Sequence, residues 1–185
     1  GKVYHISTDC VFSGKKGGYY DADEKDALDV YGMSKNLGEL INGHDLTLRT
    51  SIIGPELKVN GEGLMHWIFS QREVGYLSGY KKSIWSGVTT LELAKVVDAC
   101  ITADVTGLYQ ISNNIKITKY DLISLVVKEF NLGIKVNEID GLICDKSIIN
   151  TVLRDFVYPI SSYETMIKEM HVFMDTHKKL YGQYY

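Results

Sequence analysis

Three segments of the sequence decide the fold: VYHIST at residues 3–8, YGMSKNLGELI at residues 31–41 and LTLRTSII at residues 46–53. The first and third have the composition of β-strands, and the second has that of a helix closed by Asn42-Gly43, a typical helix end. Strand, helix and strand in this order predict a βαβ unit, whose two strands lie parallel in a sheet that helices cover on both faces.

Helix signals recur later in the chain. Thr89-x-x-Glu92 has the form of a capping box and opens an apolar-periodic helix, Thr118 stands at a second helix start, and Ser161-x-x-Glu164 opens a last helix. A short strand is expected at residues 108–112. The expected fold class is therefore α/β: the C-terminal part of a Rossmann-type doubly wound parallel sheet plus a small mixed α/β substrate-binding lobe.

The predicted domain organisation places the second half of an NAD(P)-binding fold in residues 1–55 and a substrate-binding lobe in residues 56–185. Residues 84–112 of that lobe are expected to pack back on the parallel sheet. A complete dinucleotide-binding fold starts with a strand and a glycine-rich turn such as Gly-x-Gly-x-x-Gly, and the sequence contains no such turn. We therefore expect the N-terminal glycine-rich half to be absent and NADP or NAD binding to be weak.

Composition narrows the function classes. The 185 residues carry a formal net charge of -3, so the chain has no general attraction for nucleic acid or for anionic membranes. No apolar run is long enough to span a bilayer. The three cysteines lack Cys-x-x-Cys spacing and the five histidines lack the pairing of a zinc site, so neither a disulfide framework nor a metal is predicted. We expect a soluble cytoplasmic protein.

The residues with catalytic chemistry are Thr8, Tyr31 and Lys35. With 13 tyrosines in the chain, a Tyr-x-x-x-Lys spacing also arises by chance. The evidence that Tyr31 and Lys35 form a catalytic pair comes from the position of Thr8 at the end of the preceding strand. Reduction of a carbonyl leaves an alkoxide that needs a proton, which the phenol of Tyr31 can give. Lys35 lies on the same helix face, where its cation can favour the phenolate and can donate to ribose hydroxyls of a cofactor. The hydroxyl of Thr8, or of Ser7 beside it, can bind the substrate oxygen.

The runs STDCVFSG at residues 7–14 and YGMSKNLGE at residues 31–39 resemble the extended short-chain dehydrogenase/reductases, most closely the dTDP-4-dehydrorhamnose reductase group. LRTS at residues 48–51, GVTTLELA at residues 87–94 and GLYQIS at residues 107–112 look like later landmarks of that family in the right order. The resemblance implies that Thr8, Tyr31 and Lys35 form the catalytic triad. It also implies an NADPH-dependent reduction of a 4-keto nucleotide-sugar.

The sequence departs from the family pattern at Cys10, where that group usually has an aromatic residue, and in an acidic loop without the usual prolines. The identity of the sugar therefore stays open. Epimerases, dehydratases and a non-catalytic regulatory subunit of methionine adenosyltransferase share this scaffold, so those functions remain alternatives. A homodimer is also left open.

Arg49 ends a predicted strand, where its guanidinium suits a diphosphate and equally suits a structural ion pair. Lys81, Lys82 and Trp85 combine charge with an aromatic surface that suits a nucleotide, although a solvated loop is the simpler interpretation. The terminal tyrosines are expected to cover a surface or fray: Tyr181, Tyr184 and Tyr185.

Overall fold

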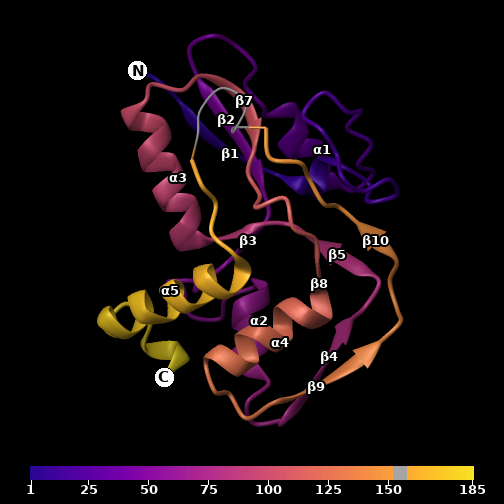
Figure 1. Ribbon diagram of the computed structural model, residues 1–185, viewed down its shortest axis with the longest axis vertical. Coiled ribbons are helices and arrows are strands. Elements are labelled where there is room, and N and C mark those ends of the chain that lie inside the picture. Colours follow the sequence, from indigo (N-terminus) through magenta and orange to yellow (C-terminus); the bar gives the residue numbers. More distant parts are fainter. Residues whose placement is uncertain (152–157) are drawn as a thin grey trace.

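The computed structural model describes residues 1–151 and 158–185, and its N-terminal part is built on a three-stranded parallel sheet (Figure 1). The strand order is β1 (Tyr4–Thr8), β2 (Leu46–Thr50) and β7 (Gly107–Gln110), with Thr8 opposite Thr50 and Arg49 opposite Gln110. In the view of Figure 1, α1 (Val30–Leu37) and α3 (Thr90–Thr102) lie on opposite sides of these strands. The predicted βαβ unit and the α/β fold class are confirmed.

The helix expected over residues 31–41 is shorter than predicted, because α1 ends at Leu37. Asp29 caps its start by accepting a hydrogen bond from the amide of Gly32 at 2.8 Å. At the other end the amide of Gly38 is shared between the carbonyl groups of Ser34 and Lys35, both at 3.2 Å, which closes the last turn. The chain then turns inward and carries Glu39 to the sheet.

The strand expected over residues 46–53 is divided in two at Ser51. β2 ends at Thr50, and β3 (Ile52–Ile53) leaves the main sheet to pair in parallel with β6 (Val88–Thr89). The carbonyl of Ser51 accepts a hydrogen bond from the amide of Val88 at 2.9 Å, which holds the two strand pairs together at the break. Continuous strand composition alone did not show this change of partner.

Three later helices begin at a hydroxyl side chain that accepts a hydrogen bond from the helix. Thr89 caps α3, Thr118 caps α4 (Lys119–Glu129) and Ser162 caps α5 (Tyr163–Thr176). The first two caps are those predicted. Ser161 was the wrong choice for the last one, because its own amide bonds to the carboxylate of Glu92 at 3.0 Å and the helix begins one residue later.

Residues 76–145 contain two further small sheets. One has the order β10 (Cys144–Asp145), β5 (Ser83–Trp85), β8 (Ile117–Thr118), and the other pairs β4 (Tyr76–Tyr80) with β9 (Lys135–Ile139) in parallel. The remaining elements are short: η1 (Asp9–Val11), α2 (Leu64–Ser70) and η3 (Gly182–Tyr184). β5 is thus flanked on both sides by strands that are distant from it in sequence.

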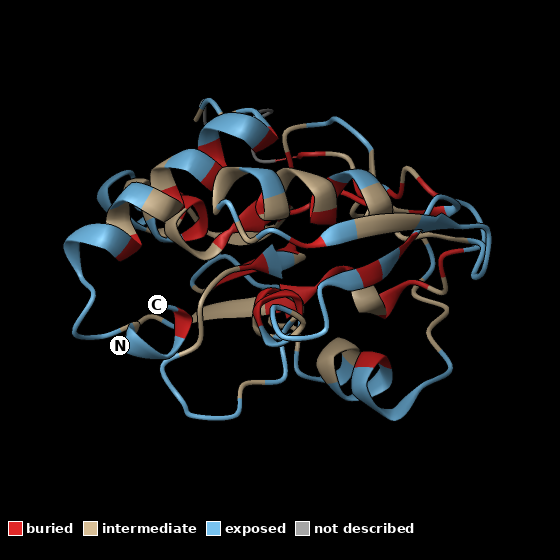
Figure 2. Cartoon of the chain, turned by 90° about the horizontal axis from the view of Figure 1, so that it is seen from below, coloured by how far each residue is buried: buried red, intermediate tan, exposed pale blue. Residues whose placement is uncertain are grey.

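One apolar core joins most of these elements. It includes Leu46 and Leu48 of β2, Val96 of α3, Leu122 of α4 and Met166 of α5, all at most 1% exposed. Figure 2 shows the buried positions gathered in the interior and the outward faces of the helices exposed. This core contains residues from before and from after position 55, so it does not mark a boundary there. The division into residues 1–55 and 56–185 stays a prediction. Among the described residues no helix is long and apolar enough to cross a membrane.

Candidate active site

A cavity of about 420 Å³ lies at the carboxyl ends of β1 and β2. Ligands of open parallel sheets bind at this edge, because loops there leave a crevice between neighbouring strands. The described lining is formed by Ile6, Ser7, Thr8, Asp9, Cys10, Tyr31, Lys35, Thr50, Ser51 and Ile52. The structure therefore brings the three predicted site residues Thr8, Tyr31 and Lys35 to one cavity, although 22 residues of loop and helix separate Thr8 from Tyr31.

Helix α1 presents Tyr31 and Lys35 to this cavity. Its close approach to η1 requires a glycine at position 32, since a Cβ there would lie 2.2 Å from the carbonyl oxygen of Cys10. Tyr31 is 57% exposed, so its phenol is accessible to a substrate. The ammonium of Lys35 donates one hydrogen bond, at 2.7 Å, to the carbonyl oxygen of Ile6 in β1. That bond fixes the lysine at the sheet edge and leaves two of its three donors for other acceptors.

Thr8 closes β1 and caps η1 with its side chain. Its Oγ1 accepts a hydrogen bond from the amide of Cys10 at 3.1 Å and donates to Oδ1 of Asp9 at 3.2 Å. Thr8 is 6% exposed and its hydroxyl keeps one acceptor position free. To donate to a substrate oxygen, the hydroxyl of Thr8 must turn away from Asp9.

Asp9 is a site residue that sequence reasoning named only as part of a longer run. It lines the cavity and is 5% exposed. Burial raises the pKa of its carboxyl above the ordinary value, and the hydrogen bond from Thr8 together with the charges of Lys119 and Lys146 lowers it by less. The sequence feature that could have identified Asp9 is its position directly after Thr8, at the end of the strand.

Arg49 forms a structural ion pair, and this decides between its two interpretations. It is completely buried, and its Nε and one terminal nitrogen bond to the two carboxylate oxygens of Glu39 at 2.6 and 2.7 Å. Burial alone would raise the pKa of Glu39, but the hydrogen bonds from Arg49 and Ser7 hold that pKa below its usual range. The hydroxyl of Ser7 donates to the buried carboxylate of Glu39 at 2.8 Å, whereas the hydroxyl of Thr8 makes a longer bond, at 3.2 Å, to Asp9 in the cavity lining.

Lys81, Lys82 and Trp85, for which the sequence suggested either a solvated loop or a nucleotide surface, do not form one patch. Lys81 and Lys82 are half-exposed and pair with the carboxylates of Glu138 and Asp140 at 2.7 and 3.3 Å. Trp85 is 3% exposed, and its indole nitrogen donates to Oγ of Ser51 at 2.8 Å. The interpretation as a solvated loop holds for the two lysines, whereas Trp85 is a buried residue of β5 that bonds to the cavity wall.

The terminal tyrosines differ from one another. Tyr184 is buried, its ring packs edge-on against Phe69, and its hydroxyl accepts a hydrogen bond from the amide of Glu56 at 2.9 Å. Tyr181 packs on the same core, and Tyr185 is about half exposed. Tyr184 is therefore a core residue, whereas Tyr181 covers that core and Tyr185 lies at the surface.

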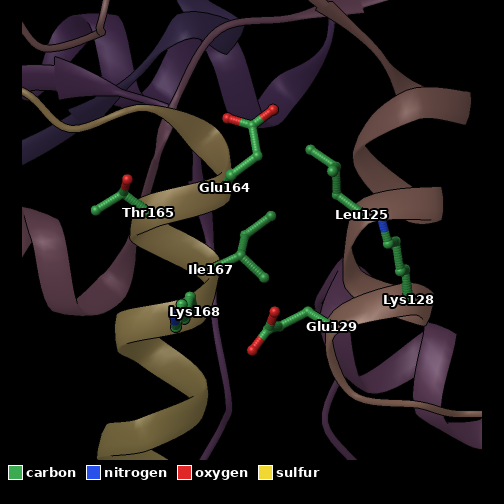
Figure 3. Close-up of a pocket in the computed structure, with 7 residues that line it drawn as sticks. All are labelled: Leu125, Lys128, Glu129, Glu164, Thr165, Ile167 and Lys168. Carbon is green, nitrogen blue, oxygen red and sulfur yellow. The ribbon is translucent and has the colours of Figure 1, made fainter.

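A second hollow, of about 340 Å³, lies between α4 and α5 (Figure 3). Leu125 of α4 and Ile167 of α5 line it together with the charged side chains of Lys128, Glu129 and Glu164. Its lining has no tyrosine, histidine or cysteine, and none of the predicted catalytic residues. In the described part of the chain no group of three His, Cys, Asp or Glu side chains is placed to hold a metal ion.

The cavity beside β1 fits part of a nicotinamide cofactor. The phenol of Tyr31 and the two unused donors of Lys35 suit ribose hydroxyls, which accept and donate hydrogen bonds. The glycine-rich turn that places a helix N-terminus against a pyrophosphate is not present in the sequence. The residues of this chain can therefore hold the nicotinamide-ribose end of NAD or NADP, and they offer no such support to the diphosphate.

Residues 2–142 match the sequence model of a family described as the RmlD substrate binding domain. No curated protein sequence matched the chain.

Solved structures share the fold over nearly the whole chain. A dTDP-4-dehydrorhamnose reductase from Bacillus anthracis, solved with NADP, aligns with 93% of this chain at 21% identity and a TM-score of 0.78. A hypothetical dTDP-4-dehydrorhamnose reductase from Sulfolobus tokodaii aligns with 85% at 25% identity and a TM-score of 0.70. A UDP-N-acetylglucosamine 4-epimerase from Methanobrevibacter ruminantium aligns with 95% at 16% identity and a TM-score of 0.72. The chain spans 66%, 59% and 63% of the lengths of these three proteins.

Proposed function

The chain belongs to the RmlD substrate binding domain family of the extended short-chain dehydrogenase/reductases, and from this premise we propose that it serves the NAD(P)-dependent reduction of a 4-keto nucleotide-sugar. The observation that supports the proposal most directly is the meeting of Thr8, Tyr31 and Lys35 at one cavity beside the parallel sheet. The chain would supply the proton donor and the substrate lobe.

In this proposal the substrate carbonyl enters the cavity with its oxygen toward the phenol of Tyr31 and the hydroxyl of Thr8. The cofactor, when bound, supplies the hydride. Tyr31 gives its proton to the developing alkoxide, and its exposed phenol can reach a ligand without rearrangement of α1. Lys35, held by the carbonyl of Ile6, places a positive charge one helical turn from Tyr31, where it stabilises the phenolate that remains.

The test is the oxidation of NADPH by the protein as its natural source makes it, with 4-keto nucleotide-sugars as substrates. Tyr31→Phe keeps the ring and removes the proton, so we expect turnover to fall by at least about 100-fold, the range of general acid catalysis. Tyr76→Phe is the matched control, because Tyr76 is 59% exposed and lies on β4, outside the cavity lining. Equal activity of Tyr31→Phe and the wild type would refute the proposal.

The second candidate is a nucleotide-sugar epimerase or dehydratase. It is favoured by the fold shared with the Methanobrevibacter ruminantium epimerase and with a dTDP-glucose 4,6-dehydratase (rfbB) from Bacillus anthracis. An epimerase or dehydratase recycles its cofactor, whereas a reductase consumes one NADPH for each product. The stereochemistry of the product and the stoichiometry of NADPH oxidation therefore separate the two.

A non-catalytic regulatory module would show neither activity. It would instead co-purify with a partner enzyme in a fixed ratio.

A further inference from the structure

Ser51 is a residue of the cavity lining that the proposed reaction does not use. It follows β2 at the point where the chain leaves the main sheet, and it lines the cavity together with its neighbours Thr50 and Ile52. Thr8 at the end of β1 is paired with Thr50, so Ser51 lies one residue beyond the strand pair that carries Thr8. Neighbouring strands are about 4.8 Å apart, so the side chains of Thr8 and Ser51 can contact one small ligand.

The segment from Trp85 to Val88 holds Ser51 in place. The indole nitrogen of Trp85 donates a hydrogen bond to Oγ of Ser51 at 2.8 Å, and the amide of Val88 donates to the carbonyl of Ser51 at 2.9 Å. Gly87 packs so closely against this carbonyl that an added Cβ would overlap its oxygen. Trp85 is buried and packs against the ring of Tyr163, with ring centroids 5.6 Å apart. The core therefore fixes the direction from which the indole donates.

This hydrogen bond determines what the hydroxyl of Ser51 can do. An indole N–H only donates, so Oγ of Ser51 must accept from Trp85, and the hydroxyl proton remains to be donated elsewhere. Among the described residues, 1–151 and 158–185, no acceptor is placed to receive that proton. By contrast, the hydroxyl of the adjacent Thr50 donates to the carbonyl of Ile111 at 2.9 Å. Ser51 thus brings a donor without a protein acceptor to the cavity lining.

We propose that Ser51 is a specificity-determining residue that donates its hydroxyl proton to an uncharged oxygen of the sugar, and that Trp85 is the positioning residue for this hydroxyl. The inference rests on the proposed function, which places the reacting carbonyl oxygen at Thr8 and Tyr31. Because Ser51 lies one residue beyond the strand end opposite Thr8, its partner is an oxygen on a neighbouring carbon of the same ring. In a 4-keto pyranose the 3-hydroxyl group is the one bonded to a carbon next to the keto group, so we assign Ser51 to that hydroxyl.

The test measures the binding of a matched pair of ligands, so it does not depend on turnover. The 185-residue chain is titrated with UDP-glucose and with UDP-3-deoxyglucose, two stable alcohol counterparts of a keto substrate that differ in the 3-hydroxyl group. Backbone amide NMR shifts report both binding and fold. Ser51→Ala removes the donor, and Trp85→Phe keeps an aromatic ring in the core but removes the indole N–H. Ser78→Ala is the control, since Ser78 is an exposed residue of β4 outside the cavity lining.

We expect the wild type and Ser78→Ala to bind UDP-glucose about fivefold more tightly than the deoxy analogue, the usual contribution of one neutral hydrogen bond. Ser51→Ala should abolish this difference by weakening the binding of UDP-glucose alone. Trp85→Phe should reduce the difference, because the hydroxyl of Ser51 is then free to turn. A purely structural role of either residue would instead weaken the binding of both ligands equally.

The assignment of Ser51 is overturned if the wild type binds neither ligand or binds both equally, or if Ser51→Ala affects both ligands to the same extent. The result for Ser51→Ala decides this even if Trp85→Phe fails to fold. A folded Trp85→Phe that keeps the full difference would overturn the positioning role of Trp85. None of these outcomes alters the expected loss of NADPH oxidation in Tyr31→Phe, so this proposal and the proposed function fail separately.

Discussion

Breaking the buried pair between Arg49 and Glu39 is expected to destabilise the protein strongly without removing any catalytic group. The perturbation is Arg49→Met, which keeps much of the side-chain volume and removes the charge. In the wild type the guanidinium makes two short bonds to Glu39 and a third, at 3.0 Å, to the carbonyl of Asp21. The variant leaves the carboxylate of Glu39 in the interior with Ser7 and the more distant Lys25, at 3.9 Å, as partners.

The magnitude follows from the burial of both side chains, which are 0% and 1% exposed. Removing one partner of such a pair costs about 3–5 kcal/mol, because an uncompensated charge remains in the interior. For a chain of this size the loss corresponds to a fall in Tm on the order of 10 °C. The control Lys25→Met removes a weaker and more exposed partner of the same carboxylate, and we expect it to cost at most about 1 kcal/mol.

The contribution of the Arg49–Glu39 pair to stability depends on pH. Because the folded state holds the pKa of Glu39 below its usual range, the pair stabilises the wild type above the unfolded-state pKa, and this contribution is lost as the pH falls through the folded-state pKa. In Arg49→Met burial dominates and raises that pKa, so acid relieves the variant. The difference in Tm between the two proteins should therefore shrink as the pH falls.

The assay is thermal unfolding followed by circular dichroism from neutral to acid pH, with Arg49→Met, Lys25→Met and the wild type in parallel. A difference in Tm below that of the Lys25→Met control at neutral pH would refute the structural role of Arg49. A difference that grows toward acid pH would contradict the electrostatic explanation.

Three further predictions concern the cavity and its surroundings. Gly32→Ala should lower the free energy of unfolding by about 1–3 kcal/mol in denaturant titrations, because its Cβ would overlap the carbonyl of Cys10, whereas Gly43→Ala, which has open space around it, should be nearly neutral. Asp9→Asn should stabilise the protein at neutral pH. Burial raises the folded-state pKa of Asp9, so the wild type loses stability as the pH rises from the unfolded-state pKa to the folded-state pKa. A Tm that the substitution leaves unchanged would contradict this. Calorimetric titration of the 185-residue chain with NADPH should show no low-micromolar binding, because the sequence supplies no glycine-rich turn for the pyrophosphate, and tight binding would require another phosphate site.

The sequence predicted the parts of the site that depend on local order along the chain. Tyr31 and Lys35 are four residues apart on a helix, and Thr8 ends the preceding strand, so a parallel βαβ unit necessarily brings them to one edge of the sheet. Their catalytic roles stay a proposal. The helix ends were predicted less well: α1 ends at Leu37, and Glu39, which was expected within the helix, instead bonds to Arg49.

Local patterns in the sequence determined the fold class, the parallel pairing of the first two strands and the caps at Thr89 and Thr118, because strand composition and capping act between residues close in the chain. Only the tertiary structure decided that Arg49 is a buried ion pair, that Trp85 is a link in the core, and that the charges of Lys119 and Lys146 act on the carboxyl of Asp9. These contacts join residues far apart in sequence, and the pairing of a charged side chain is settled by which groups the packed sheets and helices bring within reach of it.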